Sequence, residues 1–313
     1  MKNLIKIFVA VVALFAFSCA TDTTNDLGAN LAGQTTLTLS LDGTRTHIEG
    51  EVGGVYPMYW SEGDQISVNG VASATLTAAQ AGKTSATFTL SGELATPYCV
   101  AYPAAEANKV LFASNQVHNT NTTFGNGVST MYGYGAESVE LHHLTGVLKI
   151  GVTGTATLTH AQISTADRAP IAGAFDIDFT SGEVTPSADA VTAINYSFGS
   201  GVTLSSEPTY LHIAVPAGVY GELYVTLYDS NNGVMYATVK ADDTKPLTAG
   251  NLRSFTSSLT YKADESLFVI RDAASLKAFK QAVEDANNPL AVDAVLVAYS
   301  ISYMQSISCK MPG

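Results

Sequence analysis

Histidines and paired carboxylates are the residues of this chain that could bind a metal or catalyse a reaction. His142 and His143 are adjacent in a strand-like run, where neighbouring side chains point to opposite faces and cannot share one ion. The other histidines have no Cys, Asp or Glu at the spacing of a metal ligand. The run from Asp176 to Asp178 lacks the third acidic or Asn position and the glycine of a calcium loop, so we interpret it as a strand that enters a turn. We expect no metal, no cofactor and no catalytic residues, and therefore no enzyme.

Cys19 is a candidate for lipid attachment, because it ends an apolar N-terminal segment. Residues 4–17 are apolar except for Lys6, and this stretch is too short to span a bilayer, which needs roughly 20 apolar residues. It fits the apolar part of a secretory signal peptide. Small residues precede Cys19 as in a bacterial lipobox, which predicts that Cys19 becomes the lipidated N-terminus of the mature chain and its membrane anchor. Ala16 stands where a lipobox has leucine, so an ordinary signal peptide with an incidental cysteine is the alternative.

The charge balance excludes one large class of function. Charged residues make up 13% of the 313 residues, and 15 Lys and Arg against 27 Asp and Glu give a formal net charge of −12. Binding to nucleic acid needs clustered Lys and Arg, which this chain lacks. A hydrophobic fraction of 46% argues against disorder. The composition is typical of an all-β protein outside the cytoplasm.

Alternating apolar and polar residues predict the strands that must position any functional group. Leu37, Leu39 and Leu41 alternate with Thr and Ser, which is typical of a half-buried strand. Two alternating runs at 220–228 and 233–239 flank an Asn- and Gly-containing turn and predict a hairpin. Short strands at regular spacing favour β-sandwiches. We predict an all-β fold with two tandem Greek-key (transthyretin-like) β-sandwich domains and one short C-terminal helix.

The boundary between the two sandwiches is placed near residue 136. Residues 115–135 are rich in Asn, Thr and Gly with little periodicity, so we interpret them as a loop. Leu276, Phe279 and Val283 predict a helix over 273–286. Residues 289–313 match neither sandwich, and our hypothesis is that they are a truncated or frame-shifted end. The expected organisation is a lipoprotein signal peptide at 1–19, a tether at 20–34, sandwiches at 35–136 and 137–262, and the helix with an extra segment at 263–313.

Several motifs, taken in their order along the chain, resemble those of the fimbrillin-like proteins of Bacteroidetes, the subunits of type V pili and their relatives. They are the lipobox-like Cys19, Thr44-Arg45-Thr46, Trp60-x-x-Gly63-Asp64-x-Ile66, Tyr98-x-x-x-Tyr102-Pro103, the strand containing His142, Pro216-Ala217-Gly218-x-Tyr220, and Leu247-Thr248-Ala249-Gly250. Each motif alone is weakly specific, and their order carries the resemblance over residues 1–262. Trp60, Gly63, Asp64, His142, Pro216 and Gly218 are the residues of these motifs that we expect to be structural.

The resemblance implies a mechanism of assembly. The precursor would cross the periplasm as a lipoprotein and be cut after Arg45 by an arginine- or lysine-specific protease, which leaves Thr46 as the new N-terminus. The cut would release the strand of Leu37, Leu39 and Leu41. A missing strand leaves an apolar groove and unpaired backbone groups, and a strand from another subunit satisfies both. The expected partners are other pilin subunits in a fimbrium on the cell surface, the outer membrane through Cys19, and a host or bacterial surface receptor.

Two alternatives stay open from the sequence. In the first alternative Arg45 is not a processing site but a solvated hairpin residue after an ordinary edge strand. The protein would then be an uncut outer-membrane surface lipoprotein that binds glycans or host ligands. Trp60 is the candidate sugar platform in that case, although a residue of the sandwich core is the favoured interpretation. An exposed aromatic cluster would favour the glycan alternative, and a long apolar groove beneath residues 35–45 would favour the pilin.

Overall fold

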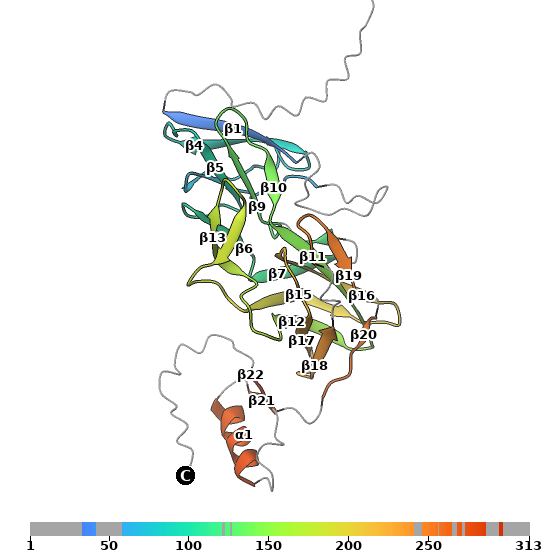
Figure 1. The fold of residues 1–313 in the computed structure, drawn as a ribbon. Coiled ribbons are helices and arrows are strands. Elements are labelled where there is room, and N and C mark those ends of the chain that lie inside the picture. Colours follow the sequence, from blue (N-terminus) through green and yellow to red (C-terminus); the bar gives the residue numbers. More distant parts are fainter. Residues whose placement is uncertain are drawn as a thin grey trace, which may run out of the picture.

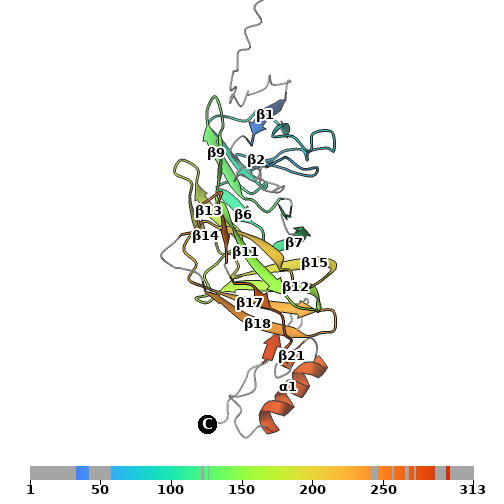
Figure 2. The same ribbon diagram turned by 90° about the vertical axis from the view of Figure 1, so that its right-hand side faces the viewer.

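Strands make up most of the protein, as the alternating pattern predicted. The computed structural model describes residues 33–41, 58–120, 123–125, 127–240, 246–255, 257–264, 268–270, 273–285 and 294–296. Among these residues α1 (Ala273–Asp285) is the single helix, so the fold is all-β. Figures 1 and 2 show β1 (Gln34–Ser40) at one end of an elongated molecule and α1 at the other. Cys19, Arg45 and Thr46 lie outside the described residues.

Two sheets pack together near the N-terminus, and we call them the N-terminal sandwich. One sheet pairs β1 with β4 (Ser85–Ser91). The other has the order β10-β9-β5-β2-β3, with β10 at Leu141–His143, β9 at Met131–Gly135, β5 at Tyr98–Tyr102, β2 at Ser67–Val68 and β3 at Val71–Ala72. Alternate residues of both sheets point into one core, which includes Leu37, Phe88, Val100 and Met131.

Three further sheets share a second core, and we call them the C-terminal sandwich. The largest has the order β18-β17-β12-β15-β7-β8, with strands at Val234–Lys240, Glu222–Asp229, Thr157–Thr165, Ala193–Thr203, Asn115–Thr120 and Thr123–Phe124. It faces the sheet of β16 (Thr209–Pro216), β11 (Thr145–Thr153), β19 (Leu252–Ser254) and β20 (Leu259–Thr260). The third sheet joins β14 (Glu183–Pro186), β13 (Gly173–Asp178) and β6 (Lys109–Phe112). Residues of all three sheets, such as Ile150, Phe175 and Val225, contribute to this core.

Strand pairing crosses the boundary that was placed near residue 136. β6 pairs with β13 and β7 pairs with β15, although β6 and β7 precede the boundary. β10 follows the boundary, yet it pairs with β9 and contributes Leu141 to the N-terminal core. The division into 35–136 and 137–262 stays a prediction. In the structure β6 and β7 belong to the C-terminal sandwich, and β10 belongs to the N-terminal sandwich.

The interpretation of residues 115–135 as a loop was wrong, because β7, β8 and β9 occupy most of that stretch. β7 lacks the alternation of apolar and polar residues that predicts a strand, because most of its side chains are polar. Asn115 pairs with Asn195 on the outer face of the six-stranded sheet, where polar residues are favoured. Gln116 is buried but forms hydrogen bonds to the backbone of Ala214, as described below. A polar sequence can therefore form a strand when its side chains find partners.

Other local predictions are confirmed. β17 and β18 form the predicted antiparallel hairpin, and Asp229 accepts hydrogen bonds from the turn amides of Asn231 and Gly233. Asp178 ends β13 and accepts a bond from the amide of Thr180, as expected for a strand that enters a turn. α1 ends at Asp285, close to the expected end. Parallel strands β21 (Phe268–Ile270) and β22 (Ala294–Leu296) accompany it.

The described part of the chain has neither a membrane-crossing helix nor a metal-binding cluster. It contains no helix with the length and apolarity needed to cross a membrane. It also contains no group of three or more His, Cys, Asp and Glu side chains that could hold a metal ion.

Candidate functional site

β1 is an edge strand that has a hydrogen-bonded neighbour on one side only among the described residues. Its seven residues pair in antiparallel register with β4, from Gln34 opposite Ser91 to Ser40 opposite Ser85. Residues with odd numbers direct their backbone groups toward β4, as shown by the bond of 2.7 Å from the Leu41 amide to the Thr84 carbonyl. The backbone groups of Thr36 and Thr38 therefore face the open edge. A strand paired along one edge can leave without breaking a second ladder.

The inner face of β1 is held by burial of three leucines. The exposed fractions of Leu37, Leu39 and Leu41 are 1%, 0% and 2%, and all three belong to the N-terminal core. Leu37 lies opposite Phe88 of β4. Burying three leucine side chains stabilises the docked strand by about 5–9 kcal/mol. We call the surface that β1 covers, formed by β4, Trp60 and the core beneath them, the β1 groove.

Trp60 forms part of the floor of the β1 groove. It is fully buried, and its ring meets Phe88 and Tyr102 edge to face at centroid distances of 4.9 and 5.3 Å. Its indole Nε1 donates a hydrogen bond of 3.4 Å to the Leu39 carbonyl of β1. The favoured interpretation as a core residue is confirmed by this burial, and Trp60 does not offer a sugar platform.

The turn that follows Trp60 explains the spacing of the Trp-x-x-Gly-Asp motif. Gly63 has a φ of +86°, a conformation that favours glycine. Asp64 is buried and accepts hydrogen bonds of 2.7 Å from the Ser61 amide and 2.8 Å from the Tyr102 hydroxyl. Burial, and then the neighbouring Asp64, raise the pKa of Tyr102 well above its usual value, so the phenol keeps its proton and remains a donor. The motif thus fixes Trp60 and Tyr102 beneath β1.

Thr35 is a buried polar contact between β1 and the end of β4. Its hydroxyl donates a bond of 2.9 Å to the Gly92 carbonyl and accepts one of 3.0 Å from the Leu94 amide. The Thr35 side chain is 2% exposed, whereas Gly92 is exposed and Leu94 is half-buried, so the two hydrogen bonds are partly buried. Nothing in the local sequence marks Thr35, since threonine is common at the start of exposed strands.

The segment that contains the expected cleavage site starts and ends beside the β1 groove. Leu41 bonds to Thr84, and the Trp60 amide donates a bond of 2.9 Å to the carbonyl of Lys83, the preceding residue. Leu41 and Trp60 therefore lie beside consecutive residues, Thr84 and Lys83. Arg45 and Thr46 come between them in the sequence, outside the described residues, and their role in processing stays a prediction.

The remaining motif residues lie away from the β1 groove. His142 is exposed on β10, with its ring 5.4 Å from that of Tyr132. The Pro216 carbonyl accepts a bond of 2.6 Å from the Tyr220 hydroxyl. Gly218 exchanges two backbone bonds with Leu247. Each of these residues makes local contacts and none joins β1 in a common site.

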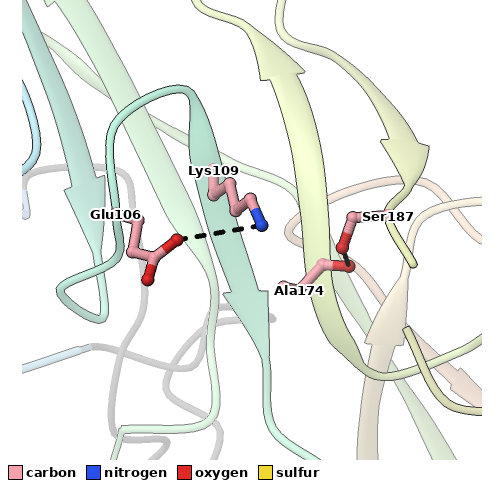
Figure 3. Close-up of polar contacts among 4 residues, drawn as sticks. All are labelled: Glu106, Lys109, Ala174 and Ser187. Atoms are coloured by element: carbon pink, nitrogen blue, oxygen red, sulfur yellow. Dashed lines mark hydrogen bonds and ion pairs between the residues drawn. The ribbon is translucent and has the colours of Figure 1, made fainter. Parts of the chain in front are cut away.

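A cleft of about 430 Å³ lies where β6 and β13 meet the N-terminal sandwich. Figure 3 shows two polar contacts that involve lining residues: Lys109 lies 3.8 Å from Glu106, and the Ser187 hydroxyl donates to the Ala174 carbonyl. An exposed ion pair of this kind contributes about 0–1 kcal/mol. The cleft has no pair of a nucleophile and a base in its lining, and we assign it no chemistry.

A row of uncharged polar side chains crosses the outer face of the six-stranded sheet. The strand registers place Tyr236, Thr226, Gln162, Asn195 and Asn115 opposite one another on five successive strands. The amides of Gln162, Asn195 and Asn115 are linked by hydrogen bonds of 3.4 Å. We call these five residues the polar row.

Two tyrosines mark one end of the polar row. The ring of Tyr236 is 47% exposed and lies 5.4 Å from that of Tyr224. Burial and the neighbouring Tyr224 raise the pKa of Tyr236, so its hydroxyl stays protonated. The sequence reasoning missed this pair, although the predicted hairpin brings residues 224 and 236 within two positions of each other.

Comparison with known proteins shows similarity to three solved structures of low sequence identity. No protein-family model matches the sequence, and no curated protein matches it. A provisionally assigned cell adhesion protein from Bacteroides uniformis is 14% identical with a TM-score of 0.40, over 74% of this chain and 94% of that chain. A fimbrial protein from Bacteroides ovatus is 8% identical with a TM-score of 0.31, over 70% of this chain and 49% of that chain. A second provisionally assigned cell adhesion protein, from Bacteroides fragilis, is 10% identical with a TM-score of 0.34. That match covers 78% of this chain and 96% of that chain. At these values the function has to be argued from the residues of this chain.

Proposed function

We propose that this protein is an adhesive or fimbrial subunit of the cell surface that polymerises by strand exchange at the β1 groove. The precursor is exported as a lipoprotein on Cys19, and a protease cuts after Arg45. β1 then leaves, and a strand from another subunit takes its place. The order of the fimbrillin-like motifs along the chain supports the same proposal.

The one-sided attachment of β1 carries this proposal. Three buried leucines and a ladder with β4 make the groove a good acceptor for an extended segment, because that segment gains both apolar burial and backbone bonds. The open edge of β1 permits it to be replaced from one side. Displacement needs an incoming strand, since spontaneous loss of β1 would expose the three leucines at a cost of about 5–9 kcal/mol.

Proteolysis of the folded, unlipidated precursor tests this proposal. An arginine-specific protease is expected to produce a new N-terminus at Thr46, and the product is expected to form SDS-resistant ladders. Arg168 also lies in an exposed loop, so the new N-terminus has to be sequenced. The variant Arg45→Ala should lose both the Thr46 terminus and the ladders. Folded protein that is not cut at Arg45 would favour the uncut surface lipoprotein.

A second candidate function is capture of neutral glycans, and the polar row favours it. Exposed tyrosines and amides are the groups that bind the faces and hydroxyls of sugars, and within the described residues the row itself carries no charge. Tyr236→Ala should abolish glycan binding by the uncut protein on an array. Tyr134→Ala removes an exposed tyrosine of the N-terminal sandwich and serves as the matched control. Equal binding by both variants would reject this candidate.

A further inference from the structure

If β1 leaves, two sets of polar groups in the β1 groove lose their hydrogen-bond partners. The Gly92 carbonyl and the Leu94 amide lose the Thr35 hydroxyl. The Trp60 indole loses the Leu39 carbonyl. Any extended strand restores the carbonyl, because its backbone supplies one. A strand with an aliphatic side chain at the place of Thr35 cannot restore the first pair, whereas a hydroxyl there can.

We propose that the β1 groove selects its incoming strand by a hydroxyl followed by three aliphatic side chains. The pattern is Ser or Thr at the position of Thr35 and aliphatic residues at the positions of Leu37, Leu39 and Leu41. This inference rests on the proposed strand exchange, and it names the partner as an extended segment of another subunit with that pattern. We call the pattern the hydroxyl-aliphatic code.

The hydroxyl fixes the register, which the leucines alone leave open. A slip of one residue would turn Thr36, Thr38 and Ser40 into the core, so the apolar face already excludes it. A slip of two residues keeps the same face inward and is not excluded by alternation. It would, however, place Gly33 or Leu37 opposite Gly92 and Leu94, and both backbone groups would lose their partner.

The size of the effect follows from burial. Thr35 is as deeply buried as the leucines, and an apolar replacement removes its two partly buried hydrogen bonds to Gly92 and Leu94. Loss of two hydrogen bonds weakens binding by about 5- to 100-fold. Thr38 provides the contrast, because its hydroxyl bonds that of Thr87 at an exposed position, where water can replace either partner.

The chain contains a second segment with the hydroxyl-aliphatic code. Thr209, Leu211, Ile213 and Val215 of β16 repeat the spacing of Thr35, Leu37, Leu39 and Leu41 with different residues between them. β16 is paired with β11 in the C-terminal sandwich, so it does not compete in the folded protein. As a free peptide it offers a natural test of the code.

Peptide binding to an emptied groove tests the inference. A full chain with a unique protease site inserted after Arg45 allows β1 to be cut whether or not Arg45 is the natural site. Exchange of the cut β1 for labelled peptides is followed by peptide anisotropy and by the emission of Trp60, the only tryptophan of the chain. The probes are the peptide of residues 33–41, its Thr35→Val, Thr35→Ser and Thr38→Val variants, and the peptide of residues 208–216.

The outcomes separate the code from strand exchange itself. We expect Thr35→Val to bind about 5- to 100-fold more weakly than the wild-type peptide, Thr35→Ser and Thr38→Val to bind within about threefold, and the β16 peptide to bind within about tenfold. Equal binding by the Thr35→Val and wild-type peptides would overturn the code while strand exchange stands. If the wild-type peptide itself does not enter the groove, the proposed function fails as well.

Discussion

β1 and β11 are both strands with buried leucine, isoleucine or valine side chains, yet they are held in different ways. Among the described residues β1 pairs with β4 alone, whereas β11 pairs with β16 on one side and with β19 and β20 on the other. β1 is half-buried, while most residues of β11 are buried on both faces of its sheet. The difference teaches that burial alone does not decide which strand can be exchanged. Within the described residues β1 has one hydrogen-bonded neighbour and β11 has neighbours on both sides, so we expect β1 to be the easier of the two to replace.

The largest expected effect compares core truncations in the two strands. Ile150→Ala in β11 and Leu39→Ala in β1 each remove a fully buried side chain and should lower the free energy of unfolding by about 2–5 kcal/mol in uncut protein. After β1 has been removed, the effect of Leu39→Ala should vanish and that of Ile150→Ala should remain. Urea unfolding of cut and uncut protein measures both. A persistent effect of Leu39→Ala would mean that β1 does not leave.

The next effect concerns the edge of β16 that does not face β11. There the side chain of Gln116, and not a neighbouring strand, forms hydrogen bonds with the backbone of Ala214. The Gln116 side-chain amide donates a bond of 2.7 Å to the Ala214 carbonyl and accepts one of 2.9 Å from the Ala214 amide. Gln116→Leu should cost about 2–4 kcal/mol, because both backbone groups become unpaired in a buried place. Gln162→Leu on the exposed outer face is the matched control and should cost less than about 0.5 kcal/mol. Similar losses in the two variants would contradict a protective role for Gln116.

A smaller effect should appear on acidification and should originate in the C-terminal sandwich. Burial, with Lys149 and His118 as secondary causes, lowers the pKa of His212 from 6.5 to about 4. Its ring Nδ1 has no hydrogen-bond partner among the described residues. The unfolded chain therefore binds the proton more readily than the fold, so stability is full above pH 6.5 and falls as the pH drops toward 4, by about 2–3 kcal/mol.

Urea unfolding between pH 7 and pH 4.5 measures this loss. His212→Gln should flatten the pH profile, while His142→Gln, at an exposed position of β10, should leave the profile of the parent protein. A flat profile for the parent protein would reject the assignment of acid sensitivity to His212. The comparison also separates the two sandwiches, because His212 of β16 is the buried histidine of the described residues.

The smallest effect should come from polar contacts at the surface. Lys109→Ala removes the ion pair with Glu106, and we expect a change in the free energy of unfolding of less than about 0.5 kcal/mol. Thermal unfolding at low and high salt gives the measurement. A loss above about 1 kcal/mol would show that the junction of β6 with the N-terminal sandwich is more important for stability than its exposure suggests.

Local pattern was sufficient for much of the fold. The alternation around Leu37 and the hairpin of β17 and β18 follow from residues close in sequence, and both are seen in the structure. The alternation could not show that β1 has one neighbour, because pairing partners are set by distant strands. It also could not mark Thr35 or Gln116, whose partners are backbone groups 57 and 98 residues away. β7 was missed for the same reason, since its polar residues are explained only by contacts with β15 and β16.

The parallel pairing of β11 with β20 has a consequence for how the chain reaches its fold. Thr153 meets Thr260, a partner 107 residues later in the sequence, and β7 pairs with β15 across a separation of about the same order. A chain that emerges from its N-terminus displays the apolar faces of β6 and β11, and the unpaired polar strand β7, long before their partners exist. Folding should therefore be slow and prone to aggregation, and a holding chaperone should improve the yield more than a longer refolding time.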